Sequence, residues 1–212
     1  VVAANGRVVV ALAGVGEIAI GEEDDFSLRR TRVGRRPTAI WLNEKQDQVV
    51  IANTFDDSIS VVQLDQHEET ARISLGPKGE LTDAMRGELL FFDASISHDS
   101  WMSCHSCHTN GHTNGMLNDN FSDKSFGAPK RVLSLLGVKD TAPFAWNAEA
   151  ADFATQIRNS IETTMQSDLP ATDKQINYLI AYLRSLEPPP SVVELRGRMD
   201  KQLVARGKQL FS

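Results

Sequence analysis

The chain has 212 residues, a net charge of −6 and an apolar content of 41%, enough for one large domain or two small ones with a real core. Its acidic balance, and the lack of a basic run that could follow a phosphate backbone, argue against a nucleic-acid partner. No stretch of about 18 consecutive apolar residues occurs, so the sequence predicts no membrane span.

The first third of the chain contains an internal repeat with an offset of 41 residues. Val8–Ala11 aligns with Val49–Ala52, and Ile18–Ile20 aligns with Ile59–Val61, without a gap. Each copy has a β-branched run, a turn and a second strand, and a repeat of this length is typical of β-propeller blades. Residues 1–77 are therefore predicted to form antiparallel strands of fewer than two blades. A closed propeller needs at least about four blades, so a small sheet packed on the rest of the chain stays an alternative.

Beyond these strands the apolar spacing is that of helices. A helix that Thr82 and Asp83 can cap is predicted to run through Met85, Leu89 and Phe92. Another is predicted over Glu149–Met165, where apolar side chains recur at every fourth residue. Thr172–Gln175 forms a capping-box pattern ahead of a further helix, and Pro188–Pro190 ends that helix.

Both cysteines of the chain lie in one pentapeptide, Cys104-His105-Ser106-Cys107-His108. A C-x-x-C-H sequence is the signature of c-type haem attachment, in which two thiols form thioethers and the histidine binds iron. We therefore predict one covalent haem c in this chain, held by Cys104 and Cys107, with His108 as an iron ligand. Attachment of this kind implies an exported protein, so the predicted location is the periplasm or another exported compartment.

Two other interpretations of the cysteine pair stay open. Cys104, Cys107, His108 and His112 have the ligand types of a tetrahedral zinc site, although zinc sites usually join two separated ligand pairs. A redox dithiol would need a βαβ setting and would leave the histidine unexplained.

A second, shorter repeat joins two distant segments. Met85–Phe91 and Ala205–Phe211 share the pattern R-G-x-x-L-F at an offset of 120 residues. The first copy precedes the cysteine motif. Residues 191–212 are therefore predicted to hold a linker and the start of a truncated second cytochrome domain, after a cytochrome c-like haem domain at 78–190.

Residues 84–187 resemble one domain of the bacterial di-haem cytochrome c peroxidases. The resemblance rests on the R-G-x-x-L-F helix, the C-x-x-C-H motif, a methionine ahead of the last helix, and the segments Lys130–Val138 and Thr141–Trp146. It departs at Trp146–Ala148, where the family usually carries an Asp-Gly pair. Residues 1–77 resemble bacterial propellers of the YVTN type, through the segments Val33–Ile40, Val50–Asn53 and Ser58–Val62.

In that peroxidase family, two haem domains on one chain pass electrons between a peroxide-reducing site and an electron-accepting site. The strand repeat and the helical patterns predict an α+β chain, with a mostly helical cytochrome c-type domain preceded by a small antiparallel β segment. The resemblance implies electron transfer within a peroxidase-like oxidoreductase. Its partners would be a second haem domain or an electron donor or acceptor protein, with peroxide as a substrate. A non-enzymatic electron carrier, in which the propeller part recognises a partner, is the alternative.

The sixth iron ligand decides between these functions, because a methionine ligand suits electron transfer and an open position lets peroxide bind. Met165 is the first candidate, since it lies where the family's C-terminal segment returns toward the haem. Its place in an apolar helical stripe is equally consistent with plain core packing. His112 and Met116 lie in a loop that can fold back over a haem edge. His112 ranks below Met165, since a histidine four residues after His108 would struggle to reach the opposite face of a haem. His98 and His105 are expected at the surface or beside the ligands.

Supporting roles are expected for four further sites. A carbonyl near Pro129 could accept the N–H of His108 and fix its tautomer. Arg131 is predicted to bind the cofactor by neutralising a haem propionate. Trp101 and Trp146 are predicted to pack near the macrocycle.

Overall fold

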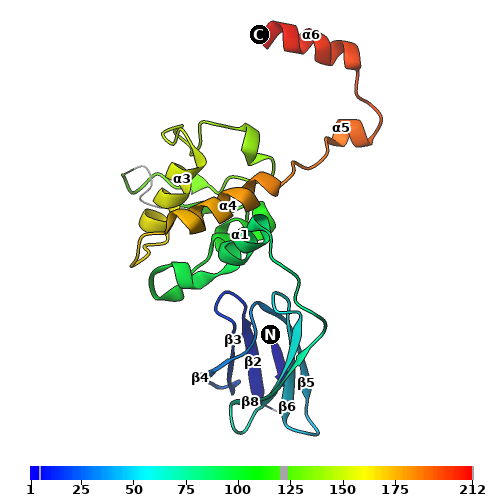
Figure 1. The fold of residues 1–212 in the computed structure, drawn as a ribbon, viewed down its shortest axis with the longest axis vertical. Helices are drawn as coiled ribbons and strands as arrows, with labels where there is room; N and C mark the ends of the chain where they lie inside the picture. Colours follow the sequence, from blue (N-terminus) through cyan, green and yellow to red (C-terminus); the bar gives the residue numbers. More distant parts are fainter. Residues whose placement is uncertain (5, 120–123, 212) are drawn as a thin grey trace.

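The N-terminal part of the chain, here called the sheet segment, consists of β-strands rich in β-branched residues. Helices follow it along the chain (Figure 1). The computed structural model describes residues 1–4, 6–119 and 124–211. The sheet segment consists of β1 (Val2–Ala4), β2 (Arg7–Leu12), β3 (Glu17–Glu22), β4 (Asp25–Arg32), β5 (Pro37–Asn43), β6 (Gln48–Asn53), β7 (Ser58–Gln63) and β8 (Glu68–Ser74). The remaining elements include α1 (Asp83–Phe92), α2 (Cys104–Cys107), β9 (Leu117–Asn118), β10 (Lys130–Arg131), α3 (Phe153–Asn159), a π-helical turn (Ser160–Thr164), α4 (Asp173–Ser185), α5 (Val192–Leu195) and α6 (Lys201–Phe211).

The described strands of the sheet segment pair in chain order into two antiparallel sheets, β1-β2-β3-β4 and β5-β6-β7-β8. The sequence repeat is confirmed in the register, because Val9 pairs with Ile20 and Val50, 41 residues later, pairs with Val61. The prediction of fewer than two blades is wrong: short turns fit two complete four-stranded sheets into this segment. The sheets fit a partial propeller-like segment, and with the helices they confirm the α+β class.

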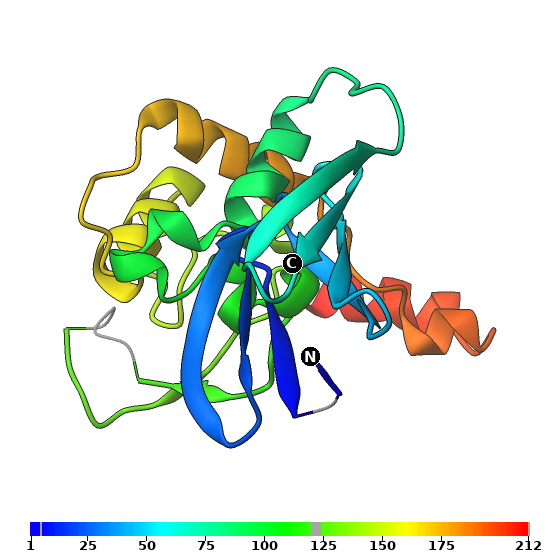
Figure 2. The same cartoon turned by 90° about the horizontal axis from the view of Figure 1, so that it is seen from below.

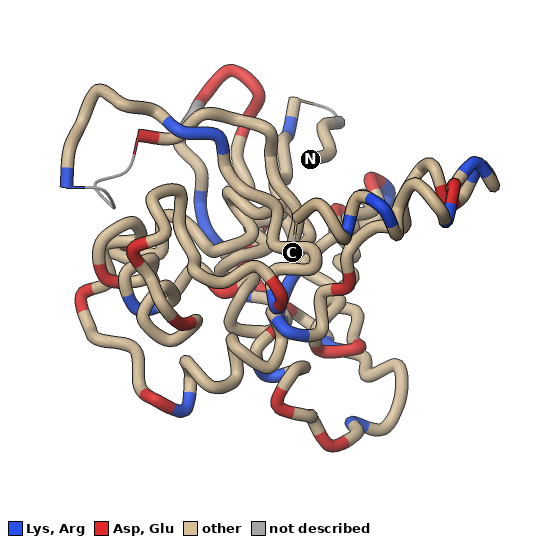
Figure 3. The backbone as a smooth tube through the Cα atoms, turned by 90° about the horizontal axis from the view of Figure 1, so that it is seen from above, with Lys and Arg blue, Asp and Glu red and all other residues tan. Residues whose placement is uncertain are grey.

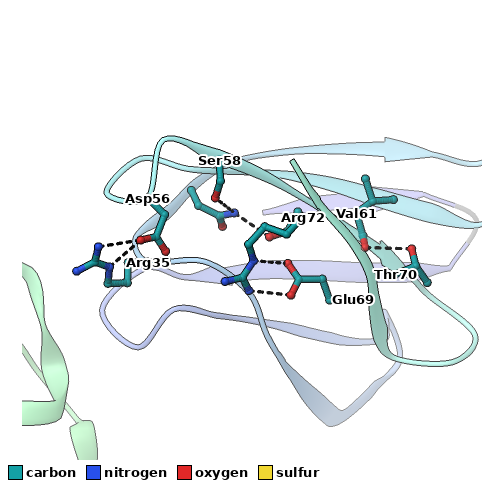
Figure 4. Close-up of polar contacts among 9 residues, drawn as sticks. Arg35, Asp56, Ser58, Val61, Glu69, Thr70 and Arg72 are labelled. Carbon is teal, nitrogen blue, oxygen red and sulfur yellow. Dashed lines mark hydrogen bonds and ion pairs between the residues drawn. The ribbon is translucent and has the colours of Figure 1, made fainter. Parts of the chain in front are cut away.

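The two sheets of this segment share one apolar core. Figure 2 shows the blue strands of the first sheet beside the cyan strands of the second. Alternate residues of each central strand point inward, so Val9 and Ile18 of the first sheet pack with Ile51 and Val62 of the second, all with no exposed surface. Ion pairs such as Arg72 with Glu69 lie on the outside (Figure 4). At the surface such pairs stabilise a fold by less than about 1 kcal/mol, so burial holds this segment together.

The predicted helix starts at Thr82 and Thr172 are confirmed. The Thr82 hydroxyl accepts the Met85 N–H at 3.2 Å, and Thr172 forms a capping box with Gln175. The helices α1 and α4 pack closely at Gly87, where a Cβ atom would lie 1.9 Å from the Tyr178 carbonyl oxygen. Glycine is therefore the residue that this helix crossing requires.

The predicted helix over Glu149–Met165 differs from the structure at its start. The Asp152 carboxylate accepts the Thr155 N–H at 2.8 Å and so caps α3, which begins at Phe153. After Asn159 the chain continues as the π-helical turn, and Met165 follows that turn. The four residues before Phe153 are not helical because the capping aspartate needs an extended backbone.

The C-terminal extension carries α5 and α6, and α6 places its apolar side chains in solvent. Leu203, Leu210 and Phe211 are exposed, Phe211 by 97%. Figure 3 shows acidic and basic residues interspersed along the chain in that view, the extension included. Within the described ranges, none of the helices has the length and apolar character that crossing a bilayer requires.

Candidate cofactor site

The C-x-x-C-H motif folds into a single helical turn. Ser103 caps α2 through reciprocal bonds with Ser106, and the His108 N–H donates to the Cys104 carbonyl at 2.9 Å. Residues three and four apart lie on the same face of a helix. The helical turn therefore brings Cys104, Cys107 and His108 onto the wall of one cavity.

This cavity has a volume of about 520 Å³, within the range of roughly 300–1,000 Å³ that is usual for cofactor sites. Much of its wall is apolar. The apolar residues of the wall include Phe91 of α1, Phe153 and Ile157 of α3, and Leu179 and Leu183 of α4. A large flat apolar group with a few polar points of attachment, such as haem, fits a cavity of this size and lining.

His108 has the tautomer that a metal ligand needs. Its Nδ1 lies 2.9 Å from the Leu133 carbonyl oxygen, and a carbonyl can only accept, so Nδ1 carries the proton and Nε2 keeps the lone pair with which a metal could be bound. Burial lowers the pKa of His108, which keeps the ring neutral. The carbonyl partner expected near Pro129 is found four residues further along, at Leu133, because the chain passes through β10 before it reaches the ring.

The two thiols lack the electrostatics of a redox dithiol. Burial raises the pKa of Cys104 to about 12 and also raises that of Cys107. Redox-active cysteines have a lowered pKa and a thiolate at neutral pH. Asn118 of β9 donates to the Cys107 sulfur at 3.2 Å, a contact that the sequence analysis did not foresee. A single asparagine in a polar loop is too common a signal to have found it.

Met165 lies on the same cavity and is 4% exposed. Its sulfur is 4.0 Å from the Cys104 sulfur. Its backbone carbonyl accepts two hydrogen bonds from the segment ahead of the cysteines, from the His98 N–H and from the Trp101 indole N–H, both at 3.1 Å. These two hydrogen bonds fix the backbone of Met165 beside the residues that precede the cysteine motif.

Arg131 and Trp146 also line the cavity. Arg131 belongs to β10, which pairs with β9, and its carbonyl accepts the Trp146 indole N–H at 2.8 Å. Trp101 is absent from the cavity wall among the described residues, because its indole is engaged with the Met165 carbonyl. Of the two tryptophans predicted to pack near a macrocycle, Trp146 thus lines the cavity and Trp101 does not.

The remaining histidines and Met116 lie away from the cavity wall. His105 bonds to Asn110 at 3.2 Å, His112 bonds to Ser134 at 2.7 Å, and Met116 is 62% exposed. In the part of the chain that the structure describes, no three His, Cys, Asp or Glu side chains gather as they would around a metal ion. The side chains proposed for zinc, Cys104, Cys107, His108 and His112, therefore do not form that site.

His98 leads to a prediction about pH. Its Nδ1 lies 2.8 Å from the Asp168 carboxylate, and this hydrogen bond raises the pKa of His98, with a smaller contribution from Asp99. We expect Asp168→Asn to lower the pKa of His98 markedly, and Asp99→Asn to lower it less, in an NMR titration of the ring. Because the folded-state pKa is raised, the pair favours the fold below the ordinary histidine pKa and loses this effect as pH rises through the raised pKa. Equal titration curves in all three proteins would contradict the assigned pairing.

Comparison with known proteins identifies the class of domain that contains this cavity, a haem-binding redox domain. Residues 83–188 match the family model described as Di-haem cytochrome c peroxidase. The chain belongs to this family, whose members bind haem and carry out redox chemistry.

A solved structure of Kuenenia stuttgartiensis hydrazine synthase, pressurized with 20 bar xenon, is similar over part of the chain. The identity is 22%, the match covers 63% of this chain and 46% of that chain, and the TM-score is 0.47. This chain thus spans less than half the length of that protein, and the likeness carries no functional argument. No curated protein matches the chain.

Proposed function

We propose that residues 78–190 form a cytochrome c-like domain that holds one covalent haem c. Cys104 and Cys107 would supply the thioether bonds, and His108 would bind the iron through Nε2. The observation that carries the proposal is the convergence of these three side chains and Met165 on one cavity, in a chain of a haem-binding family.

A bound haem supplies a one-electron redox centre, and the chain's residues set its surroundings. The Leu133 carbonyl holds the His108 ring in one tautomer and makes it more basic. Met165 would offer its thioether sulfur to the iron from the cavity wall, and a methionine ligand would raise the haem potential. Arg131 places a positive charge on the cavity wall for a propionate. The apolar side chains exclude water from the rest of the cavity.

The proposed activity is electron transfer within a peroxidase-like oxidoreductase. The donor or acceptor would be a second haem domain or a separate redox protein, with peroxide as the final oxidant, in the periplasm or another exported compartment. Residues 1–77 would be partial propeller blades, and 191–212 a linker with the first helix of a second cytochrome domain. The support for that last assignment is the R-G-x-x-L-F repeat, which falls on α1 and α6.

A carrier without enzymatic activity is the second candidate, and the burial of Met165 against the cavity favours it. If Met165 holds the sixth position, peroxide has no open site on this iron. If it packs without binding the metal, this domain becomes a site of peroxide reduction.

Replacement of Met165 by alanine tests this point. We expect the haem midpoint potential to fall by on the order of 0.1 V, since axial ligands move haem potentials over about 0.8 V. We also expect cyanide, which needs a free position, to bind the variant and to bind the parent protein poorly. The matched control is Met116→Ala, because Met116 is exposed and lies off the cavity. A parent protein that binds cyanide as readily as the Met165 variant would refute methionine ligation and favour the peroxidase.

A further inference from the structure

The sheet segment touches the helical domain through three turns at one end of its two sheets. These turns follow β2, β4 and β6 and contribute Gly14, Arg36 and Phe55. The Gly14 carbonyl accepts the Ala94 N–H, just beyond α1, at 2.8 Å. The Phe55 ring meets the Phe92 ring edge-on, with centroids 5.5 Å apart. Figure 1 shows this end of the sheets facing α1.

Arg36 is the charged member of this interface. Its guanidinium carbon lies 3.6 Å from the centroid of the Phe92 ring and 4.7 Å from that of Phe55, which is cation–π geometry. Among the described residues no carboxylate forms an ion pair with it. Arg36 also has a φ of 53°, a left-handed conformation that glycine adopts at less cost. A turn that would favour glycine thus carries a half-buried arginine.

The contact continues from Phe92 into the cysteine motif. Phe92 is 8% exposed and its ring stacks on the His105 ring, with centroids 4.5 Å apart and planes tilted by 38°. His105 lies within α2, between Cys104 and Cys107. Burial lowers the pKa of His105, with a smaller contribution of the same sign from the Arg36 charge. The Phe92 ring therefore connects Arg36 to the helix that carries the cysteines.

We infer that the stack of Arg36, Phe92 and His105 docks the sheet segment onto α2, and that Arg36 is a positioning residue for the cofactor attachment helix. Part of this inference rests on the proposed function, since the haem is the group that the helix would carry. An unneutralised positive charge close to a haem stabilises the reduced, less positive iron. Loss of Arg36 would therefore loosen the helix and lower the haem midpoint potential.

The test compares the variants Arg36→Gln, Arg36→Lys and Arg35→Gln by hydrogen exchange and by redox titration of the full chain. Arg35 is the matched control because its guanidinium pairs with Asp56, at 2.8 Å (Figure 4), whereas that of Arg36 lies against the Phe92 ring. Exchange is followed at the Ala94 N–H, which reports docking, and at the His108 N–H, which reports the integrity of α2.

In Arg36→Gln we expect about tenfold faster exchange at both amides and about a threefold shift of the reduction equilibrium toward the oxidised form. Arg36→Lys keeps the charge without the planar stacking group, so its potential should stay near that of the parent while Ala94 exchanges faster. Arg35→Gln removes the same charge from the neighbouring position without removing the contact with Phe92, so its exchange at both amides should match that of the parent.

An Arg36→Gln protein that keeps the parent's potential overturns the inference, whether or not its exchange changes. A failure of the proposed function gives a different result, namely a chain without covalent haem in the parent and in all variants. The two amides still test the docking in that case, and unchanged exchange in Arg36→Gln would overturn it.

Discussion

A chain with both Cys104 and Cys107 replaced by alanine is expected to lose covalent haem completely. In the proposed site, two thioether bonds attach the haem, one from each of these sulfurs. His108 alone would hold a haem by coordination, which denaturation breaks. After denaturing electrophoresis, a haem stain should therefore label the parent band strongly and leave the double variant unlabelled.

Ser106→Ala is the control for that experiment. Ser106 lies in the same helical turn and caps it through Ser103, so its loss weakens α2 by about 1 kcal/mol without removing a sulfur. This variant should keep its stain. A stained band in the cysteine double variant would contradict the assigned attachment site.

Replacement of Gly87 by alanine is expected to have the largest effect on stability. The new methyl group would lie 1.9 Å from the Tyr178 carbonyl oxygen and 2.6 Å from its carbon. Both atoms belong to the backbone of α4, so α1 and α4 would have to move apart. Overpacking of this kind costs about 3 kcal/mol or more, which lowers the melting temperature of a domain by on the order of 10 °C.

Gly207 offers a matched control because it occupies the same place in the second R-G-x-x-L-F segment. No heavy atom lies within 4 Å of the Cβ position there. Gly207→Ala should therefore leave the melting temperature unchanged or raise it slightly, since alanine favours an exposed helix by up to about 1 kcal/mol. Equal melting temperatures for the two variants, measured by circular dichroism, would show that α1 and α4 are not packed at Gly87 as described.

The elements that the sequence predicts well depend on local signals. Thr82 and Thr172 cap the helices that follow them, and the 41-residue repeat gives the register of both sheets. The helix predicted to begin at Glu149 begins later, at Phe153, and this difference also has a local cause. Apolar spacing continues through that segment, but the side chain of Asp152 caps a later helix start. Periodicity indicates a helix more reliably than it indicates its first residue.

At the candidate cofactor site, the sequence identifies the cysteine motif because its cysteines and histidine lie within five consecutive residues. The Leu133 carbonyl could not be found in this way, since it is a backbone atom 25 residues from His108. Arg36 was also missed, because its partner Phe92 belongs to a different part of the fold. Contacts of this kind depend on how separate segments pack, and no spacing rule encodes them.

The proposed redox function depends most directly on covalent haem in this chain. The decisive measurement is the visible spectrum of the reduced, denatured protein in alkaline pyridine, after production in a host that exports and matures c-type cytochromes. We expect the spectrum of a haem with two thioether bonds, with an intensity that corresponds to one haem per chain. A protein without that spectrum, with both thiols free to react and with zinc or no metal in elemental analysis, would contradict the proposed function.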